Sequence, residues 1–482
     1  MKNTREIIGN RGTVPLKLPT WFWAALVGNV GTILMAILLP LLGVRHAHTS
    51  LRTPPTQEAA SVSQAARASE PGSAPERGAG RRRAAVENAE PAPSPERVIA
   101  DKFSRFAAGR RDLFRALAAR LGRSVSPDVE RFFELAQHGS WEELEAAYQA
   151  LQHRRAAGAE DLRSVWGAIF ETFGAAETVH EWPAERLLEY GNAILGALRP
   201  GMVYVGGTDP GRFIPTLLND TTDGERHIVL TQNALADSDY VDYLRLRYGD
   251  QLAVPTDDDV RQVFDEYLGD ARRRAEHDAQ FPNEPKELRP GEQVQLSEDG
   301  HTTVAGQVAV MSINDGLLKR FMQQNPALSF GLEESYALDT SYANAVPFGP
   351  ILDLSAGDAP AAWMPEQAAG VVDYWRSAAA AFSTENPTSA DPTRLAVAKL
   401  VAAQAQLLAS HQLPSEAEQA FRLGLQICPT SPELVSRYVN LLSAQQRPQD
   451  AWSVALAAAN AAPDNRQFRD LLAGLQQQTP QN

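Results

Sequence analysis

The sequence predicts an α/β plus α protein: a single N-terminal transmembrane helix, a helical block, a small parallel-sheet α/β domain and C-terminal helical repeats. Three observations lead to this fold class. An uncharged apolar run spans residues 21–44, short apolar strands alternate with helical patterns after residue 199, and a 34-residue period runs through the last segment. This order describes a chain attached to a membrane that holds a binding module away from it.

Length and charge narrow the classes of function. The chain has 482 residues, enough for two or three domains, and a formal net charge of -14. An acidic chain argues against nucleic acid as a partner, because phosphate binding needs a basic face, and the simplest role of the charge is solubility. The single cysteine, Cys428, excludes an intramolecular disulfide and a cysteine metal cluster, and we expect it to be a packed thiol.

The apolar run 21–44 is long enough to cross about 30 Å of hydrocarbon as a helix. A cleaved signal peptide is the alternative, but its apolar core is normally shorter and ends at a small-residue cleavage site, which is missing here. More basic residues precede the run than follow it: Lys2, Arg5, Arg11 and Lys17 against Arg45 and Arg52. The positive-inside rule therefore predicts a cytoplasmic segment 1–20 and an extracytoplasmic bulk, which in a bacterium means an inner-membrane protein facing the periplasm.

Segment 45–96 is rich in Ala, Pro, Ser, Glu and Arg and contains almost no large apolar residues. Such a segment cannot bury enough surface to offset its ordering entropy, so we expect a disordered tether. Segment 97–198 then shows apolar residues at helical spacing and predicts a helical block. Its first apolar stripe consists of Phe103, Phe106, Leu113, Phe114, Leu117 and Leu121.

Segment 199–390 is the predicted α/β domain. The expected strands are Met202–Val205, His227–Leu230, Leu252–Val254, Phe330–Glu333 and Pro350–Leu354. Helical patterns follow the first three of these strands, and a further helix is expected from Val308 to Met322. Strand and helix in alternation argue for a parallel sheet.

Ligands of open α/β sheets bind beyond the carboxyl ends of the strands, where this sequence places two polar tips. The candidate ligand-binding residues are Gly206, Gly207, Thr208, Asp209 and Arg212 in the first tip, and Thr231, Gln232 and Asn233 in the second. Glycines allow close approach to a phosphate or polyhydroxyl group, and a helix N-terminus favours an anion. The alternative is a pair of tight turns, because the motif matches neither a P-loop nor the dinucleotide fingerprint. No catalytic residue, metal ligand or cofactor is predicted.

Segment 391–482 carries the 34-residue period, seen from Ala417 to Ala451 and from Pro429 to Pro463. It resembles the tetratricopeptide repeat, in which small residues let paired helices pack closely, although the usual tryptophan and glycine–tyrosine positions are missing. Two units are expected, 398–431 and 432–465, followed by a capping helix, and we expect the unit to pack on the α/β domain. This repeat class usually binds peptide segments on its concave face; a structural buttress is the alternative.

Within 199–354, three motifs resemble the extracytoplasmic C-terminal part of bacterial protein O-mannosyltransferase-like membrane proteins. They are the run from Arg199 to Asp209 before a helix, Thr231 to Leu235 before Tyr240, and the helix to Phe321 before a strand at Phe330. The family's aromatic-rich helix after the aspartate is replaced here by Pro210-Gly211-Arg212-Phe213, and the many-helix catalytic body is missing. The resemblance therefore implies an accessory part of such a system, and no catalytic residue is carried over.

These patterns predict a single-pass, membrane-anchored binding or scaffold protein. Its bilayer contact is 21–44, its repeat engages a protein partner, and its α/β domain contacts a glycan or another domain. The alternative is an enzyme that acts on a phosphorylated or glycosylated envelope substrate, with Asp209 as its central residue.

Overall fold

The computed structural model describes residues 93–289, 291–296, 302–336, 342–354, 363, 365–383 and 391–478. The predicted anchor 21–44, the segment before it and nearly all of the predicted tether lie outside these residues. Within the described part of the chain, no helix combines the length and the apolar character needed to cross a bilayer. The membrane attachment therefore stays a prediction.

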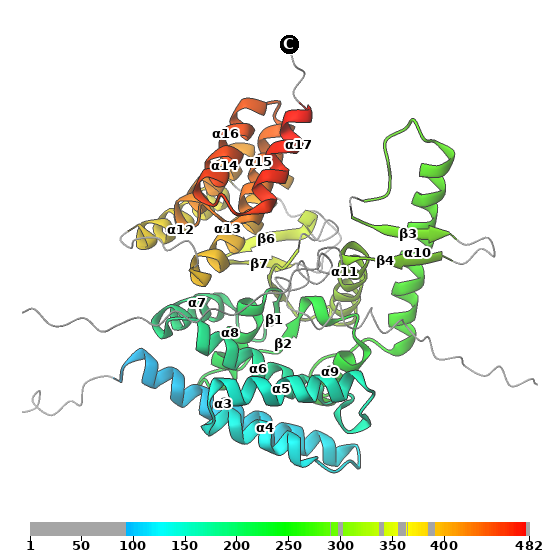
Figure 1. Ribbon diagram of the computed structural model, residues 1–482, viewed down its shortest axis with the longest axis vertical. Coiled ribbons are helices and arrows are strands. Elements are labelled where there is room, and N and C mark those ends of the chain that lie inside the picture. The colour runs from blue at the N-terminus through cyan, green and yellow to red at the C-terminus, as the bar shows by residue number, and fades with distance from the viewer. Residues whose placement is uncertain are drawn as a thin grey trace, which may run out of the picture. The chain divides into compact units, whose positions relative to one another are not determined.

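The helical block is confirmed (Figure 1). Its α-helices are α3 (Pro95–Arg120), α4 (Pro127–His138), α5 (Trp141–Ala156), α6 (Trp166–Glu181) and α7 (Ala184–Ala197). Helix α4 begins with proline, whose missing amide hydrogen costs nothing in a first turn. Helix α5 begins with a capping box, in which the Glu143 amide donates to the Ser140 hydroxyl and the Ser140 amide donates to the Glu143 carboxylate.

The sheet has the strand order β2-β1-β5-β7-β6. Its strands are β1 (Val203–Gly206), β2 (Val229–Thr231), β5 (Phe330–Glu333), β6 (Ala345–Phe348) and β7 (Ile351–Leu354). Strand β1 runs parallel to both β2 and β5, whereas β7 is antiparallel to β5 and β6 is antiparallel to β7. The expected parallel sheet is therefore only half correct: the sheet is mixed, because β6 and β7 form a hairpin instead of a crossover unit.

Helices cover both faces of the sheet (Figure 1). Val203 and Val205 of β1 share a core with α9 (Ser238–Tyr248) and α11 (Gln307–Gln324). Tyr204, between them, shares the opposite core with α7 and α8 (Asp209–Asp220). Alternate side chains of a strand point to opposite faces, so β1 is buried on both sides and reads as a continuous apolar run.

The expected strand Leu252–Val254 is wrong. The Asn325 side chain bonds the backbone there: its Oδ1 accepts the Ala253 amide at 2.8 Å and its Nδ2 donates to the Ala253 carbonyl at 2.9 Å. A backbone already paired in this way has no need of a neighbouring strand. The antiparallel hairpin of β3 (Gln293–Leu296) and β4 (Thr302–Ala305), which lies against α10 (Asp257–Gln280), was not predicted. All of its side chains are exposed or half-buried, so it shows no apolar run.

The C-terminal segment is a run of paired helices. Its members are α12 (Pro365–Phe382), α13 (Pro392–Ser410), α14 (Pro414–Ile427), α15 (Pro432–Ala444), α16 (Pro448–Ala461) and α17 (Arg466–Gln478). The 34-residue period is visible in the backbone: Gln412 and Gln446 occupy the same turn of successive hairpins, with φ of 61° and 60°. At Gly424 a Cβ atom would lie 2.7 Å from the Leu434 side chain, so this glycine permits the close packing of α14 on α15.

This run packs on the α/β domain, as expected. Gln404 of α13 donates to the carbonyls of Gly349 at 2.7 Å and Ile351 at 2.9 Å. Arg437 of α15 forms an ion pair of 2.8 Å with Glu334, a carboxylate that is only 4% exposed. The first helix of each pair is therefore tied to the segments that carry the sheet.

Candidate functional site

The loop after β1 wraps a carboxylate. Glu333, the last residue of β5, is 1% exposed, and its Oε2 accepts the amide hydrogens of Gly207 and Thr208, each at 2.7 Å. Its Oε1 accepts the hydroxyl hydrogen of Thr208, also at 2.7 Å. The sequence predicts that this tip can hold an anion, and the structure shows the chain's own carboxylate in that position.

The glycines of the tip allow this close packing. A Cβ at Gly211 would lie 1.9 Å from the Glu333 carboxylate, and one at Gly207 would lie 2.3 Å from the Ser335 amide. Thr208 caps α8 through a bond from the Gly211 amide to its hydroxyl at 3.0 Å. Burial raises the pKa of Glu333, and the hydrogen bonds from Thr208 and Gly207 oppose that rise.

The second tip meets the first, as expected for the ends of neighbouring parallel strands. Gln232 is fully buried, its Oε1 accepts the Ser335 amide at 2.8 Å, and the same oxygen would lie 2.7 Å from a Cβ at Gly207. The Thr231 amide donates to the Tyr240 hydroxyl at 2.8 Å. Both tips are therefore fastened to the chain that leaves β5 and to α9.

The predicted site residues divide by exposure. The buried ones are Gly206, Gly207, Thr208, Thr231 and Gln232, and the half-buried ones are Asp209, Arg212 and Asn233. The buried members are engaged by contacts within the protein, except that Nε2 of Gln232 has no hydrogen-bond partner in the described structure. A ligand at this end of the sheet would meet the half-buried members first.

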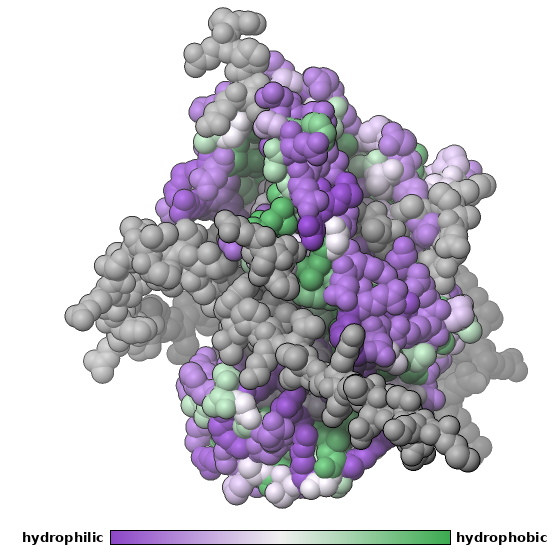
Figure 2. Space-filling view, turned by 90° about the vertical axis from the view of Figure 1, so that its right-hand side faces the viewer, coloured by the Kyte–Doolittle hydropathy of each residue, from purple (hydrophilic) through white to green (hydrophobic). Residues whose placement is uncertain are grey.

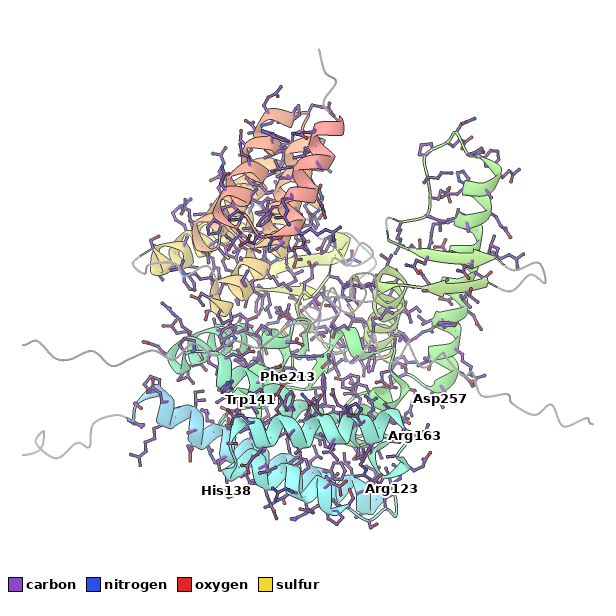
Figure 3. All side chains as sticks on the ribbon, in the orientation of Figure 1. Arg123, His138, Trp141, Arg163, Phe213 and Asp257 are labelled. Carbon is purple, nitrogen blue, oxygen red and sulfur yellow. The ribbon has the colours of Figure 1, made fainter. Side chains whose placement is uncertain are left out.

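Asp209 and Arg212 form an ion pair within the first turn of α8. The guanidinium of Arg212 also lies over two rings, 4.6 Å from the centre of Phe170 and 4.4 Å from that of Phe213. Figure 3 labels Phe213 of α8 and Trp141 of α5. Both pack on α6, Phe213 against Phe170 with ring centres 5.3 Å apart and Trp141 on Phe173 with ring centres 5.5 Å apart.

Glu177 of α6 adds a titrating group to this surface. Burial, and after it the neighbouring negative charges of Asp209 and Glu181, raise the pKa of Glu177 to about 7. A carboxyl that titrates near neutrality next to a carboxylate paired with an arginine can exchange a proton at physiological pH. Nothing in the sequence marks Glu177, because its neighbours come from α8, far along the chain.

Glu333 was visible in the sequence only as one of two consecutive glutamates, a common pattern in an acidic chain. Its role follows from the pairing of β1 with β5, which places Gly206 opposite Glu333. The described residues contain no group of three or more His, Cys, Asp or Glu side chains arranged to hold a metal ion. Comparisons with protein-family models, curated proteins and solved structures found no match to this chain, so the functional argument rests on its own geometry.

Proposed function

We propose that this protein is a single-pass, membrane-anchored, extracytoplasmic binding or scaffold protein. Its C-terminal repeat engages a protein partner in envelope glycosylation or assembly. The observation that carries the proposal is the repeat itself, whose last two helices, α16 and α17, pack mainly on α15 and on each other. The bilayer contact belongs to residues 21–44, and the resemblance of 199–354 to O-mannosyltransferase-like proteins supports the accessory role.

The repeat geometry supports a tetratricopeptide-like array. Identical backbone hydrogen bonds recur 34 residues apart, from the Leu413 amide to Leu408 and from the Arg447 amide to Leu442, each at 3.0 Å. The alanines at the helix crossings, Ala417 and Ala451, are both fully buried. Arrays of this kind present helix faces to extended protein segments.

The free surface lies on α16 and α17. These helices pack on α15 and on each other, away from the strands (Figure 1). Leu456 of α16 is 41% exposed, and Trp452, one turn earlier, is half-buried. An aromatic and an aliphatic side chain at this spacing form an apolar anchor for a partner segment.

If segment 45–96 is the tether that its composition predicts, it has a root-mean-square reach of about 40 Å, which would allow the repeat to meet a partner at a distance from the membrane. The face shown in Figure 2 is predominantly hydrophilic where described residues are visible, with hydrophobic residues in small areas. Such a surface suits a region that faces water.

The test is a cross-linked pull-down from native membranes. It compares the full chain, the variants Leu456→Glu and Trp452→Ala, and the control Gln419→Glu at an exposed position of α14. Truncation before Pro392 is a poorer test, because it would uncover the core that α13 shares with the sheet. We expect envelope glycosylation or secretion proteins to be captured by the full chain and the control and lost with the two variants. Capture that is the same for all four proteins would reject a repeat-mediated scaffold.

One observation favours a second function, an enzyme that acts on a phosphorylated or glycosylated envelope substrate. The pKa of Glu177 is raised, in part by the charge of Asp209. A carboxyl group with a raised pKa near a second carboxyl group is typical of a general acid. Thermal unfolding with sugar phosphates tests it. Ligand-dependent stabilisation that is lost with Asp209→Ala and kept with the exposed control Asp464→Ala supports the enzyme, and stabilisation that is kept in both rejects it.

A further inference from the structure

A cavity of about 370 Å³ opens between α3, the end of α9 and the segment that leads into β2. Its lining includes Arg105, Arg110, Arg226, His227, Arg247 and Tyr248. This volume is in the range of small-molecule sites. It lies at the amino end of β2, and Asp220 at its edge is separated from Asp209 by the length of α8, about 16 Å.

The inner wall is a network of ion pairs in which the charges of two arginines and two carboxylates balance. Arg110 pairs with Glu171 at 2.7 Å and with Asp220 at 2.6 Å. Arg247 pairs with the same two carboxylates, at 3.0 Å and 2.9 Å. Burial opposes the charge of Asp220, but Arg110 and Arg247 outweigh it and hold the pKa of Asp220 below its usual range. Two guanidinium groups are thus held rigidly at one side of the cavity.

The mouth carries positive charge in excess. Arg226 is exposed, and among the described residues no hydrogen bond or ion pair is formed by its side chain. Arg105 pairs only with Asp101, at 3.0 Å, and both side chains are at least half exposed. Burial and, after it, the nearby charge of Arg105 lower the pKa of Lys102 against the opposing charges of Asp223 and Asp101. This is a basic site on a chain whose net charge is -14.

The wall also holds a hydrogen-bond donor that has no acceptor in the described structure. Tyr248 is 7% exposed, it lines the cavity, and its hydroxyl has no hydrogen-bond partner within the described structure. Burial raises the pKa of Tyr248 to about 12, so the hydroxyl keeps its proton at neutral pH. A buried donor without a partner is costly, and such donors in native proteins call for an explanation such as a missing ligand.

We propose that this cavity binds a phosphomonoester. Its phosphate would be held by Arg226 and Arg105 at the mouth and by the hydroxyl of Tyr248 on the wall. Planar guanidinium forks match phosphate oxygens in pairs, which favours phosphate over a single carboxylate. Phe106 and Ile228, also in the lining, would contact the carbon part of the ligand. The inference is independent of the scaffold proposal, because no repeat residue takes part.

The phosphomonoester can be a free metabolite or a lipid headgroup, and the experiment separates them. The full chain is reconstituted in phosphatidylcholine nanodiscs and titrated with glycerol 3-phosphate by calorimetry at constant ionic strength. The titration is repeated in nanodiscs that contain phosphatidic acid. Equal binding in both discs identifies a soluble ligand, and loss of the binding heat in the phosphatidic acid discs identifies the lipid; both results support the site.

Arg226→Gln is the decisive variant, since an exposed side chain can be changed without loss of folding. We expect its affinity for glycerol 3-phosphate to fall about tenfold or more, as for the loss of a charged hydrogen bond. Arg261→Gln, which removes another exposed arginine, from α10, is the matched control and should bind like the unaltered protein. No measurable binding by the unaltered protein, or equal weakening in both variants, would overturn the proposal.

Discussion

The loop after β1 and the cavity beside α3 both gather hydrogen-bond donors around negative charge, and they differ in what is left over. At the loop, the carboxylate of Glu333 accepts from the amides of Gly207 and Thr208 and from the Thr208 hydroxyl, and the chain packs so closely that a Cβ at Gly211 would overlap it. At the cavity, two carboxylates form ion pairs with Arg110 and Arg247, while Arg226 and the Tyr248 hydroxyl have no partner within the described structure. A glycine-rich tip therefore indicates that the backbone packs closely against another group, which here is the Glu333 carboxylate of strand β5.

The largest effect is expected from the cavity wall. Arg110→Met should lower the free energy of unfolding by about 3–5 kcal/mol, because it leaves Glu171 and Asp220 buried with one cation between them. Chemical denaturation of the full chain measures this. Arg105→Met, about one and a half turns earlier on α3 and half exposed, serves as the control and should change the value by less than about 0.5 kcal/mol. A small effect of Arg110→Met would mean that the network contributes nothing to folding.

The loop should respond to the addition of a single methyl group. Gly211→Ala should cost about 2–4 kcal/mol of stability, because its Cβ would displace the Glu333 carboxylate from its donors. Gly196→Ala in α7, where a Cβ would meet nothing within 4 Å, should stabilise the protein by up to about 1 kcal/mol. Thermal or urea unfolding of both variants checks the pair. Equal changes in the unfolding free energy of the two variants would contradict the conclusion that the space beside Gly211 is filled and the space beside Gly196 is open.

Glu177 gives the protein a pH dependence of known sign. Its pKa in the folded state, about 7, lies above the ordinary value of 4.5. The stability that the protonated carboxyl provides is therefore complete below pH 4.5 and is lost as the pH rises through 7. Relative to the unaltered protein, Glu177→Gln should be more stable by about 1 kcal/mol at pH 8, after allowance for solvent screening, and equal to it at pH 4.5. Urea titrations at both pH values measure the difference, and a constant difference would contradict the assignment.

The smallest effect on folding is expected at the mouth of the cavity. Arg226→Gln should change the unfolding free energy by less than about 0.5 kcal/mol, because the side chain is exposed and has no partner within the described structure. The same variant should lose phosphate binding, so stability and binding separate at this residue. A large loss of stability would show that Arg226 belongs to the wall instead of the ligand site.

Local patterns predicted most of the elements. Helical spacing located α3 to α7, and the apolar runs located β1, β5 and β7, because these segments satisfy their backbone groups and bury their side chains as their periods require. The antiparallel half of the sheet and the β3–β4 hairpin could not be predicted, since strand direction and exposed strands leave no clear period.

For the site, the meeting of the two tips followed from strand order alone. The grouping of the residues that decide the chemistry of the site could not be predicted from strand order. Glu333 reaches Thr208 across 125 positions, and the charge of Asp209 on α8 acts on the pKa of Glu177 on α6. Arg226 and Tyr248 come together only when α9 and the chain before β2 are both in place. Such groupings depend on tertiary packing, which a single sequence does not encode in any local signal.

The position of β1 has a consequence for how the chain is made. Its one neighbour, β2, follows within a short stretch, but the other, β5, is reached only at Phe330. At an ordinary rate of synthesis this interval lasts on the order of ten seconds, during which one edge of β1 has no strand beside it. A nascent chain in this state is open to wrong pairing and would benefit from protection by a chaperone. Loss of the segment after Phe330 would make that exposure permanent and turn a short delay into aggregation.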